Sequence, residues 1–248
     1  MVSSPIVPRS KTEKDKHGVT VDETYYKQLV GSLMYLTSTR PDLMLVTSLL
    51  SKYMAKPTEL HLQAAKRVLR YLKGIVDYDI YYKNGGDDKL MAFTDSGYAG
   101  DMEDSKSTSG YGFLISSGAI SWSSKKQPIV TLLTIEAEFV AAANCACQSI
   151  WLKRILKELG HEEEDCTCIK CDNTSTIKLS KNPVLHGRNK HICVRYHFLR
   201  DLTKEGSIAL VHCGSTEQVA DIMTKPLKSD TFLKLRSMLG MCEVSEVS

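Results

Sequence analysis

The sequence contains no long hydrophobic run and no apolar leader. No stretch approaches the roughly 18 consecutive apolar residues of a membrane-spanning helix. The opening residues, MVSSPIVPRSKTEKDKHG, lack the apolar centre of a secretory signal. Hydrophobic residues make up 42% of the 248 and charged residues 25%, which is typical of a globular protein. We therefore expect an intracellular protein, in the cytoplasm, the nucleus or both, without a membrane partner.

The sequence also lacks the paired cysteine motifs of a structural zinc site. Cys166, Cys168 and Cys171 cluster in CTCIKC, and no second pair follows them. Structural zinc usually takes four Cys or His ligands in two close pairs. A chain of this length can also build its core without disulfides. We interpret the eight cysteines as buried, reduced thiols.

What the sequence does contain is four acids, each in a defined local setting. Asp95 ends the apolar run MAFTD, Asp172 follows the strand-like CTCIKC, and Asp221 opens the helix-like ADIMTKPL. Glu138 lies near the start of a long helical pattern, about 200° around the helix from Glu136, so only Glu138 is expected to face a site. Two Mg²⁺ ions about 3.5–4 Å apart need carboxylates that converge from separate elements. The four acids therefore predict a two-metal phosphodiesterase site.

The first third of the chain predicts a flexible N-terminal segment followed by helices. Residues 1–22 are polar and predict a flexible arm. Residues 23–86 carry two helical patterns, the first interrupted near Pro41. The second pattern, TELHLQAAKRVLRYLKGI, predicts an amphipathic helix. Its expected buried side consists of Leu60, Ala64, Val68, Leu69 and Leu72.

The hydrophobic pattern changes in residues 87–243, which begin with short strand-like runs. LMAFTD, YGFLIS and AISWSS precede a long helix at 134–159, and CTCIKC and IALVHC predict two later strands. Further helices are expected at 173–180, at 190–204 and from about Glu217. This order predicts an α/β domain with a mixed five-stranded sheet and helices on both faces, preceded by a small helical segment.

Basic residues concentrate in one part of this second region. Between residues 174 and 204 there are seven Lys or Arg residues and one acid. Such a run is often only a solvated helix face, but beside a carboxylate cluster we interpret it as a surface that neutralises phosphate charge. Asn173 and Ser175 are candidates for contact with a 2′-hydroxyl, although Asn173 also suits a helix N-cap. Trp122 is either part of a binding ridge or a core residue. The predicted nucleic-acid-binding residues are Asn173, Ser175, Arg188, Lys190, Lys125 and Lys126.

Long motifs give the region a family resemblance. FTDSGYAGDMEDSKSTSGYGF, ISWSSKKQPIVTLLTIEAEF, IKCDNTSTIKLSKNPVLHGRNKHI and STEQVADIMTKPL resemble the ribonuclease H domain of copia-type retrotransposon Pol polyproteins. The earlier YKQLVGSLMYLTSTRPDLMLVTSLLSKYM and HLQAAKRVLRYLKGI resemble the C-terminal end of the reverse transcriptase of such elements. The resemblance implies a ribonuclease H-like domain at 87–243, preceded at 23–86 by a helical remnant of the polymerase.

The same resemblance implies hydrolysis of the RNA strand of RNA–DNA hybrids, with two Mg²⁺ ions (or Mn²⁺) held by Asp95, Glu138, Asp172 and Asp221. Its implied partners are the hybrid and the rest of a Pol polyprotein. One departure is Gly97, where copia elements often carry a second Asp. His212 is left out of the expected catalytic set. No YxDD-type polymerase motif occurs, so polymerase activity is not expected.

A second interpretation remains open. The chain is then a domesticated or decayed retroelement fragment that binds nucleic acid or protein without cutting. Met1, directly before a truncated polymerase tail, favours an independently expressed fragment. Cleavage of a hybrid substrate separates the two interpretations.

Overall fold

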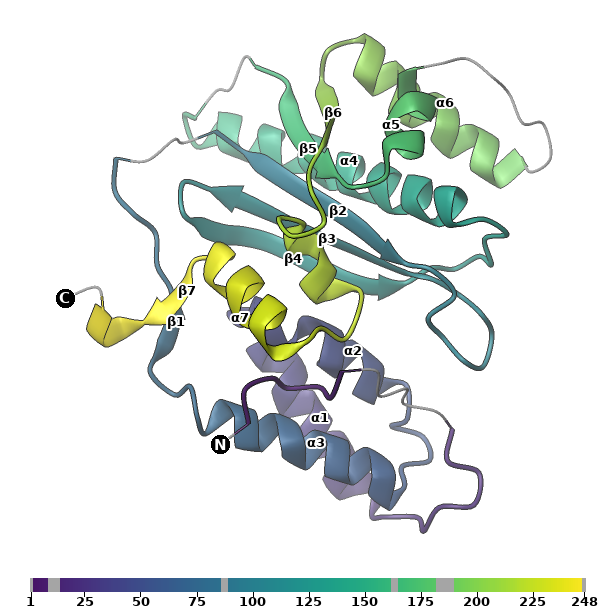
Figure 1. Cartoon of the computed structure of the whole chain (residues 1–248), viewed down its shortest axis with the longest axis vertical. Coiled ribbons are helices and arrows are strands. Elements are labelled where there is room, and N and C mark those ends of the chain that lie inside the picture. The colour runs from purple at the N-terminus through teal and green to yellow at the C-terminus, as the bar shows by residue number, and fades with distance from the viewer. Residues whose placement is uncertain (1, 9–13, 86–88, 162–164, 182–189, 247–248) are drawn as a thin grey trace.

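A five-stranded mixed sheet forms the centre of the protein (Figure 1). The computed structural model describes residues 2–8, 14–85, 89–161, 165–181 and 190–246. The strand order is β4-β3-β2-β5-β6, with β2 antiparallel to β3, β3 antiparallel to β4, and β2, β5 and β6 parallel. The predicted mixed sheet is confirmed. The strands are β2 (Met91–Gly97), β3 (Thr108–Ile115), β4 (Gly118–Lys126), β5 (Thr167–Cys171) and β6 (Ile208–His212).

One face of the sheet is covered by α4 (Thr134–Glu158), which packs with α5 (Thr174–Lys181) and α6 (Lys190–Lys204). Successive residues of a strand point to opposite faces, so Ala92 faces α4 while Phe93 faces the other side. The core on the α4 side includes Phe113, Phe139, Ala142, Ile169 and Leu210.

The opposite face packs against elements from both ends of the chain. Its core joins Phe93 and Ala119 of the sheet to Tyr26, Val68 and Leu235. Helices therefore cover both faces, as the sequence predicted. On this face η2 (Val219–Met223) and α2 (Met44–Ser51) contact the sheet, and the elements packed against them are α1 (Glu23–Leu36), η1 (Pro41–Leu43), α3 (Glu59–Leu72) and α7 (Ser229–Met238).

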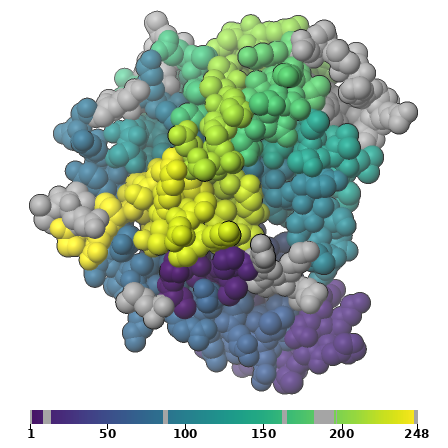
Figure 2. Space-filling view, viewed as in Figure 1, coloured from purple at the N-terminus to yellow at the C-terminus, as the bar shows by residue number. Residues whose placement is uncertain are grey.

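The N-terminal helices and the C-terminal helix are joined by a buried polar network. Arg40 donates to both carboxylate oxygens of Asp42 at 2.9 and 2.7 Å, and the Tyr71 hydroxyl donates to the same carboxylate at 2.7 Å. Arg236 of α7 donates to the Tyr71 oxygen at 3.0 Å. The short strands β1 (Tyr78–Ile80) and β7 (Met241–Glu243) also pair antiparallel. Figure 2 shows the C-terminal segment lying directly against the N-terminal one.

The buried side of α3 differs in part from the prediction: Val68 is buried and Ala64 and Leu72 are half-buried against the core, as expected, but Leu60 and Leu69 are not. His61, Ala65, Val68 and Tyr71 are buried, whereas Leu60 is 44% exposed. Leu69 is also exposed on the outer side. The helix is rotated because its polar side chains have partners inside: the Tyr71 hydroxyl bonds to Asp42, and the His61 ring accepts from the Thr58 N–H and stacks on Tyr53 at 4.0 Å.

Three further expectations need correction. Ser4 and Ile6 are buried, so this part of the expected flexible arm packs against the core. The helix expected from Glu217 is instead the 3₁₀ turn η2 followed by α7 from Ser229, because Pro226 lacks an N–H and disfavours helix before it. Among the cysteines, Cys147 and Cys166 are exposed rather than buried. Within the described residues, no helix is both long and apolar enough to cross a membrane.

Candidate active site

The parallel pairing of β2 and β5 brings two aspartates together. Parallel strands end at the same edge of a sheet, and Asp95 lies near the end of β2 while Asp172 directly follows β5. The turn η2 adds Asp221 from the C-terminal side. One carboxylate oxygen from each of the three aspartates lies within 4.8 Å of the others. Asp95 and Asp221 are buried, and Asp172 is half-buried.

Glu138 approaches the same edge from α4. Ala141 and Ala142 are fully buried, and their small side chains let the helix lie close to the sheet. The Ser96 N–H donates to Glu138 Oε1 at 3.3 Å, and a Glu138 oxygen lies within 4.8 Å of an Asp172 oxygen. Glu136 instead accepts from the N–H of Leu132 at 2.8 Å and serves the start of the helix. The structure thus brings the four predicted acids to one edge.

The acids are held in a setting that disfavours their charged forms. Burial, with the charges of Asp95 and Asp172, raises the pKa of Glu138 to about 9. Burial and the Asp95 charge raise the pKa of Asp221 to about 7. Among the described residues, Glu138 Oε2 is buried without a hydrogen-bond partner. At least one oxygen of the cluster is therefore buried without the hydrogen-bond donor or positive charge that would stabilise its charged form.

One positive charge is present, on a residue that the sequence analysis missed. Lys225 Nζ lies 2.8 Å from Asp221 Oδ1 and 3.8 Å from Asp95 Oδ2. Burial lowers the pKa of Lys225, but the charges of Asp95 and Asp221 outweigh it and the pKa is raised. The Thr224 hydroxyl donates to Asp95 Oδ2. The signal was available, since a lysine four residues after Asp221 is a common ion-pair spacing in helical segments.

The donor set fits hard divalent cations. Asp95, Glu138, Asp172 and Asp221 offer carboxylate oxygens, which Mg²⁺ and Mn²⁺ prefer. Added positive charge would give Glu138 Oε2 the partner that it lacks. It would also lower the raised pKa values of Glu138 and Asp221. These observations make the edge a candidate two-metal site.

Close approach of the C-terminal segment explains the glycine at position 97. A Cβ on Gly97 would lie 2.6 Å from the Thr224 carbonyl oxygen. A Cβ on Gly110 would lie 2.5 Å from the Thr224 methyl group. Both glycines let Thr224 approach the sheet closely. An aspartate at position 97 would push this segment away from Asp95.

The predicted nucleic-acid-binding residues have varied surroundings. Asn173 Oδ1 accepts the N–H groups of Ser175 and Thr176 at 3.0 Å each, so Asn173 caps α5. Ser175 and Lys125 are exposed. The Trp122 indole donates to the Thr37 carbonyl at 2.8 Å and packs on the core, as its core interpretation predicted. Arg188 and the side chain of Lys190 lie outside the described residues.

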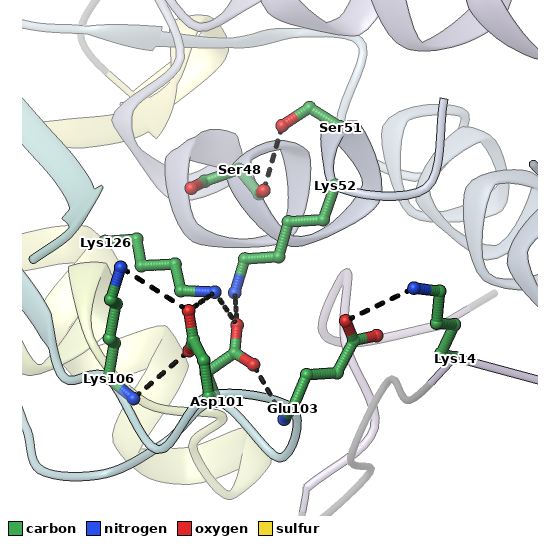
Figure 3. A network of polar contacts seen from close by, with 9 residues as sticks. Lys14, Ser48, Ser51, Lys52, Asp101, Glu103, Lys106 and Lys126 are labelled. Atoms are coloured by element: carbon green, nitrogen blue, oxygen red, sulfur yellow. Dashed lines mark hydrogen bonds and ion pairs between the residues drawn. The ribbon is translucent and has the colours of Figure 1, made fainter. Parts of the chain in front are cut away.

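Lys126 is engaged in an ion-pair network rather than directed freely to solvent. Its Nζ lies 2.7 Å from Asp101 and 2.8 Å from Asp104, in the loop after β2. Lys52, directly after α2, reaches the same Asp101 at 2.9 Å (Figure 3). Although burial raises the pKa of Asp101, hydrogen bonds from Lys126 and Lys52 outweigh it and hold the pKa low. This network ties the helical segment to the loop that follows Asp95, and it already pairs the ammonium of Lys126 with two carboxylates.

A mixed sheet in the order β4-β3-β2-β5-β6, with acids gathered where β2 and β5 end, defines a ribonuclease H-like domain. A solved structure of the foamy viral protease–reverse transcriptase, in complex with RNA/DNA hybrid, matches with a TM-score of 0.50 and 13% identity. The match covers 84% of this chain and 26% of that chain, and it shows the fold alone.

Sequence relatives specify the family. The Pol polyprotein from transposon RE1 of Arabidopsis thaliana is 40% identical over 243 residues, 98% of this chain. That from transposon TNT 1-94 of Nicotiana tabacum is 39% identical over 97% of this chain. No family model matches the sequence. The chain belongs to the copia-type retrotransposon Pol polyproteins, as its motifs predicted, and it spans 17–18% of the length of these relatives.

Proposed function

We propose that this chain hydrolyses the RNA strand of RNA–DNA hybrids. The observation that carries the proposal is the gathering of three aspartate oxygens within 4.8 Å, with Glu138 beside them, on a ribonuclease H-like sheet. Asp95, Glu138, Asp172 and Asp221 would hold two Mg²⁺ ions, with Mn²⁺ as an alternative. Such a pair activates water for attack on phosphorus and stabilises the leaving 3′-oxygen.

The surrounding residues position the acids. The Thr224 hydroxyl orients the Asp95 carboxylate, and the Ser96 N–H fixes one oxygen of Glu138. Gln218 Nε2 donates to the Thr94 carbonyl at 3.0 Å, which fastens the segment of Asp221 to β2. Without bound cations, Glu138 holds a proton at neutral pH because its pKa is about 9. That proton leaves to solvent when positive charge replaces it.

The hybrid substrate is proposed from the family and the fold. The foamy viral relative in structure was solved with an RNA/DNA hybrid, which supports a hybrid as the ligand class. We assign the phosphate-binding role to the basic stretch 178–204, including Arg188 and Lys190, and to the exposed residues Ser175 and Lys125. Residues 23–86 are proposed as the end of a polymerase, and the rest of Pol as a partner.

Cleavage of a hybrid with a labelled RNA strand tests the proposal. The wild-type protein should cut the RNA strand with Mg²⁺, stop with EDTA and spare duplex DNA. Asp95→Asn should reduce cleavage by about 100-fold or more, because metal ions contribute several kcal/mol to the transition state. Hybrid binding should persist. Asp230→Asn is the matched control, since Asp230 is exposed in the first turn of α7. Binding by the wild type without metal-dependent cleavage would instead establish a non-catalytic binding module.

A further inference from the structure

A thiol lies next to the carboxylate edge, and the proposed hydrolysis does not use it. Cys171 ends β5, and its side chain points to the α4 face because Ile169, two residues earlier, lies in the core on that side. Its Sγ, an oxygen of Glu138 and an oxygen of Asp172 all lie within 4.8 Å of one another. The end of β5 and the helix α4 thus place a sulfur ligand and two carboxylate ligands close enough together to bind one cation.

A second observation shows that one of these ligand atoms has no hydrogen-bond partner among the described residues. Glu138 is 4% exposed, and its Oε2 has no hydrogen-bond partner among the described residues. The Cys171 thiol makes a weak contact of 3.9 Å to the carbonyl of Asn173. Cys171 is fully buried as well.

The types of ligand atom determine which cation this site would bind. Mg²⁺ prefers oxygen ligands alone, whereas thiolate with carboxylate is a ligand set for Zn²⁺ and its softer relative Cd²⁺. We propose that Cys171, Glu138 and Asp172 form a site for a thiophilic divalent cation, Zn²⁺ or Cd²⁺. The site shares two acids with the proposed Mg²⁺ cluster, so occupation by one kind of ion excludes the other. The sharing rests on the proposed function, but the binding of Cd²⁺ does not.

Cadmium titration of the full metal-free chain tests the site. Cd²⁺ bound to thiolate gives an ultraviolet charge-transfer band that reports directly on sulfur ligation. In the wild type the band should saturate at one tight equivalent, and Cys171→Ser should abolish that equivalent. Cys213→Ser is the matched control, because Cys213 is also buried and its N–H donates to the Cys171 carbonyl at 3.1 Å. Cys213→Ser should retain the tight equivalent.

Glu138→Gln provides a second variant that keeps the thiol. It should weaken Cd²⁺ binding by about 10-fold or more, the scale on which changes around a metal site act. Excess Mg²⁺ should weaken wild-type Cd²⁺ binding by competition. Retention of the tight equivalent in Cys171→Ser or unchanged affinity in Glu138→Gln would overturn the proposal, whereas absence of competition by Mg²⁺ would overturn only the sharing of the two acids. Absence of hybrid cleavage in Mg²⁺, with Cd²⁺ binding as expected, would refute the proposed function and leave this site standing.

Discussion

Replacing Lys225 with methionine removes the one cation paired with the acid cluster among the described residues. Its ammonium lies 2.8 Å from Asp221 and 3.8 Å from Asp95. Methionine keeps the length and apolar stem of the side chain. We expect two opposite effects. The metal-free protein should lose stability because the acids repel each other more strongly, and the affinity for Mg²⁺ should rise because a competing charge is gone.

The size of both effects follows from the geometry. Two unit charges about 4 Å apart attract by about 4 kcal/mol at an effective dielectric constant of 20. The Lys225 side chain is 43% exposed, so solvent screening reduces the net contribution to about 1–2 kcal/mol. For a chain of this size, the loss lowers Tm by about 2–8 °C. The same free energy corresponds to an increase of about 5- to 30-fold in Mg²⁺ affinity.

Thermal unfolding during a Mg²⁺ titration measures both quantities. The metal-free Tm of Lys225→Met should lie below that of the wild type, and the two should approach each other as Mg²⁺ saturates. Lys228→Met is the control, because Lys228 is exposed three residues further along the same segment. If Lys225→Met binds Mg²⁺ no more tightly than the wild type, Lys225 does not occupy the place of the metal, and the reasoning fails.

Three further changes probe the site and the core. The pKa of Glu138 is about 4.5 in the unfolded chain and about 9 in the folded protein, so between these pH values the folded state binds one more proton. The free energy of unfolding of the metal-free protein should therefore fall as the pH rises through this range. In Glu138→Gln, the free energies of unfolding from denaturant titrations at about pH 5 and about pH 8 should differ less than they do in the wild type. Asp42→Asn should cost about 3–5 kcal/mol in urea unfolding, because Arg40 is left buried and unpaired; exposed Asp79→Asn should cost little. Gly97→Ala should weaken Mg²⁺ binding, since its Cβ would lie 2.6 Å from the Thr224 oxygen, whereas Gly31→Ala, with open space around it, should not. Equal Mg²⁺ affinity in the two glycine variants would contradict the close-approach argument.

Local periodicity determined much of what the sequence could predict. Alternation over a few residues indicated the strands, and a turn of about 100° per residue separated Glu138 from Glu136. The ends of predicted strands placed Asp95 and Asp172 at positions where parallel strands meet. These features are local, because backbone geometry fixes the direction of neighbouring side chains.

Contacts between distant segments were decided only by the tertiary structure. The Thr224 hydroxyl bonds to Asp95 across 129 positions, and Lys225 follows it into the acid cluster. The rotation of α3 depends on Asp42, which offers the Tyr71 hydroxyl a buried partner that Leu60 and Leu69 could not use. The meeting of Cys171 with Glu138 likewise depends on how closely α4 lies against the sheet. A sequence pattern states which side chains share a face, but packing and hydrogen bonding with distant partners decide what that face meets.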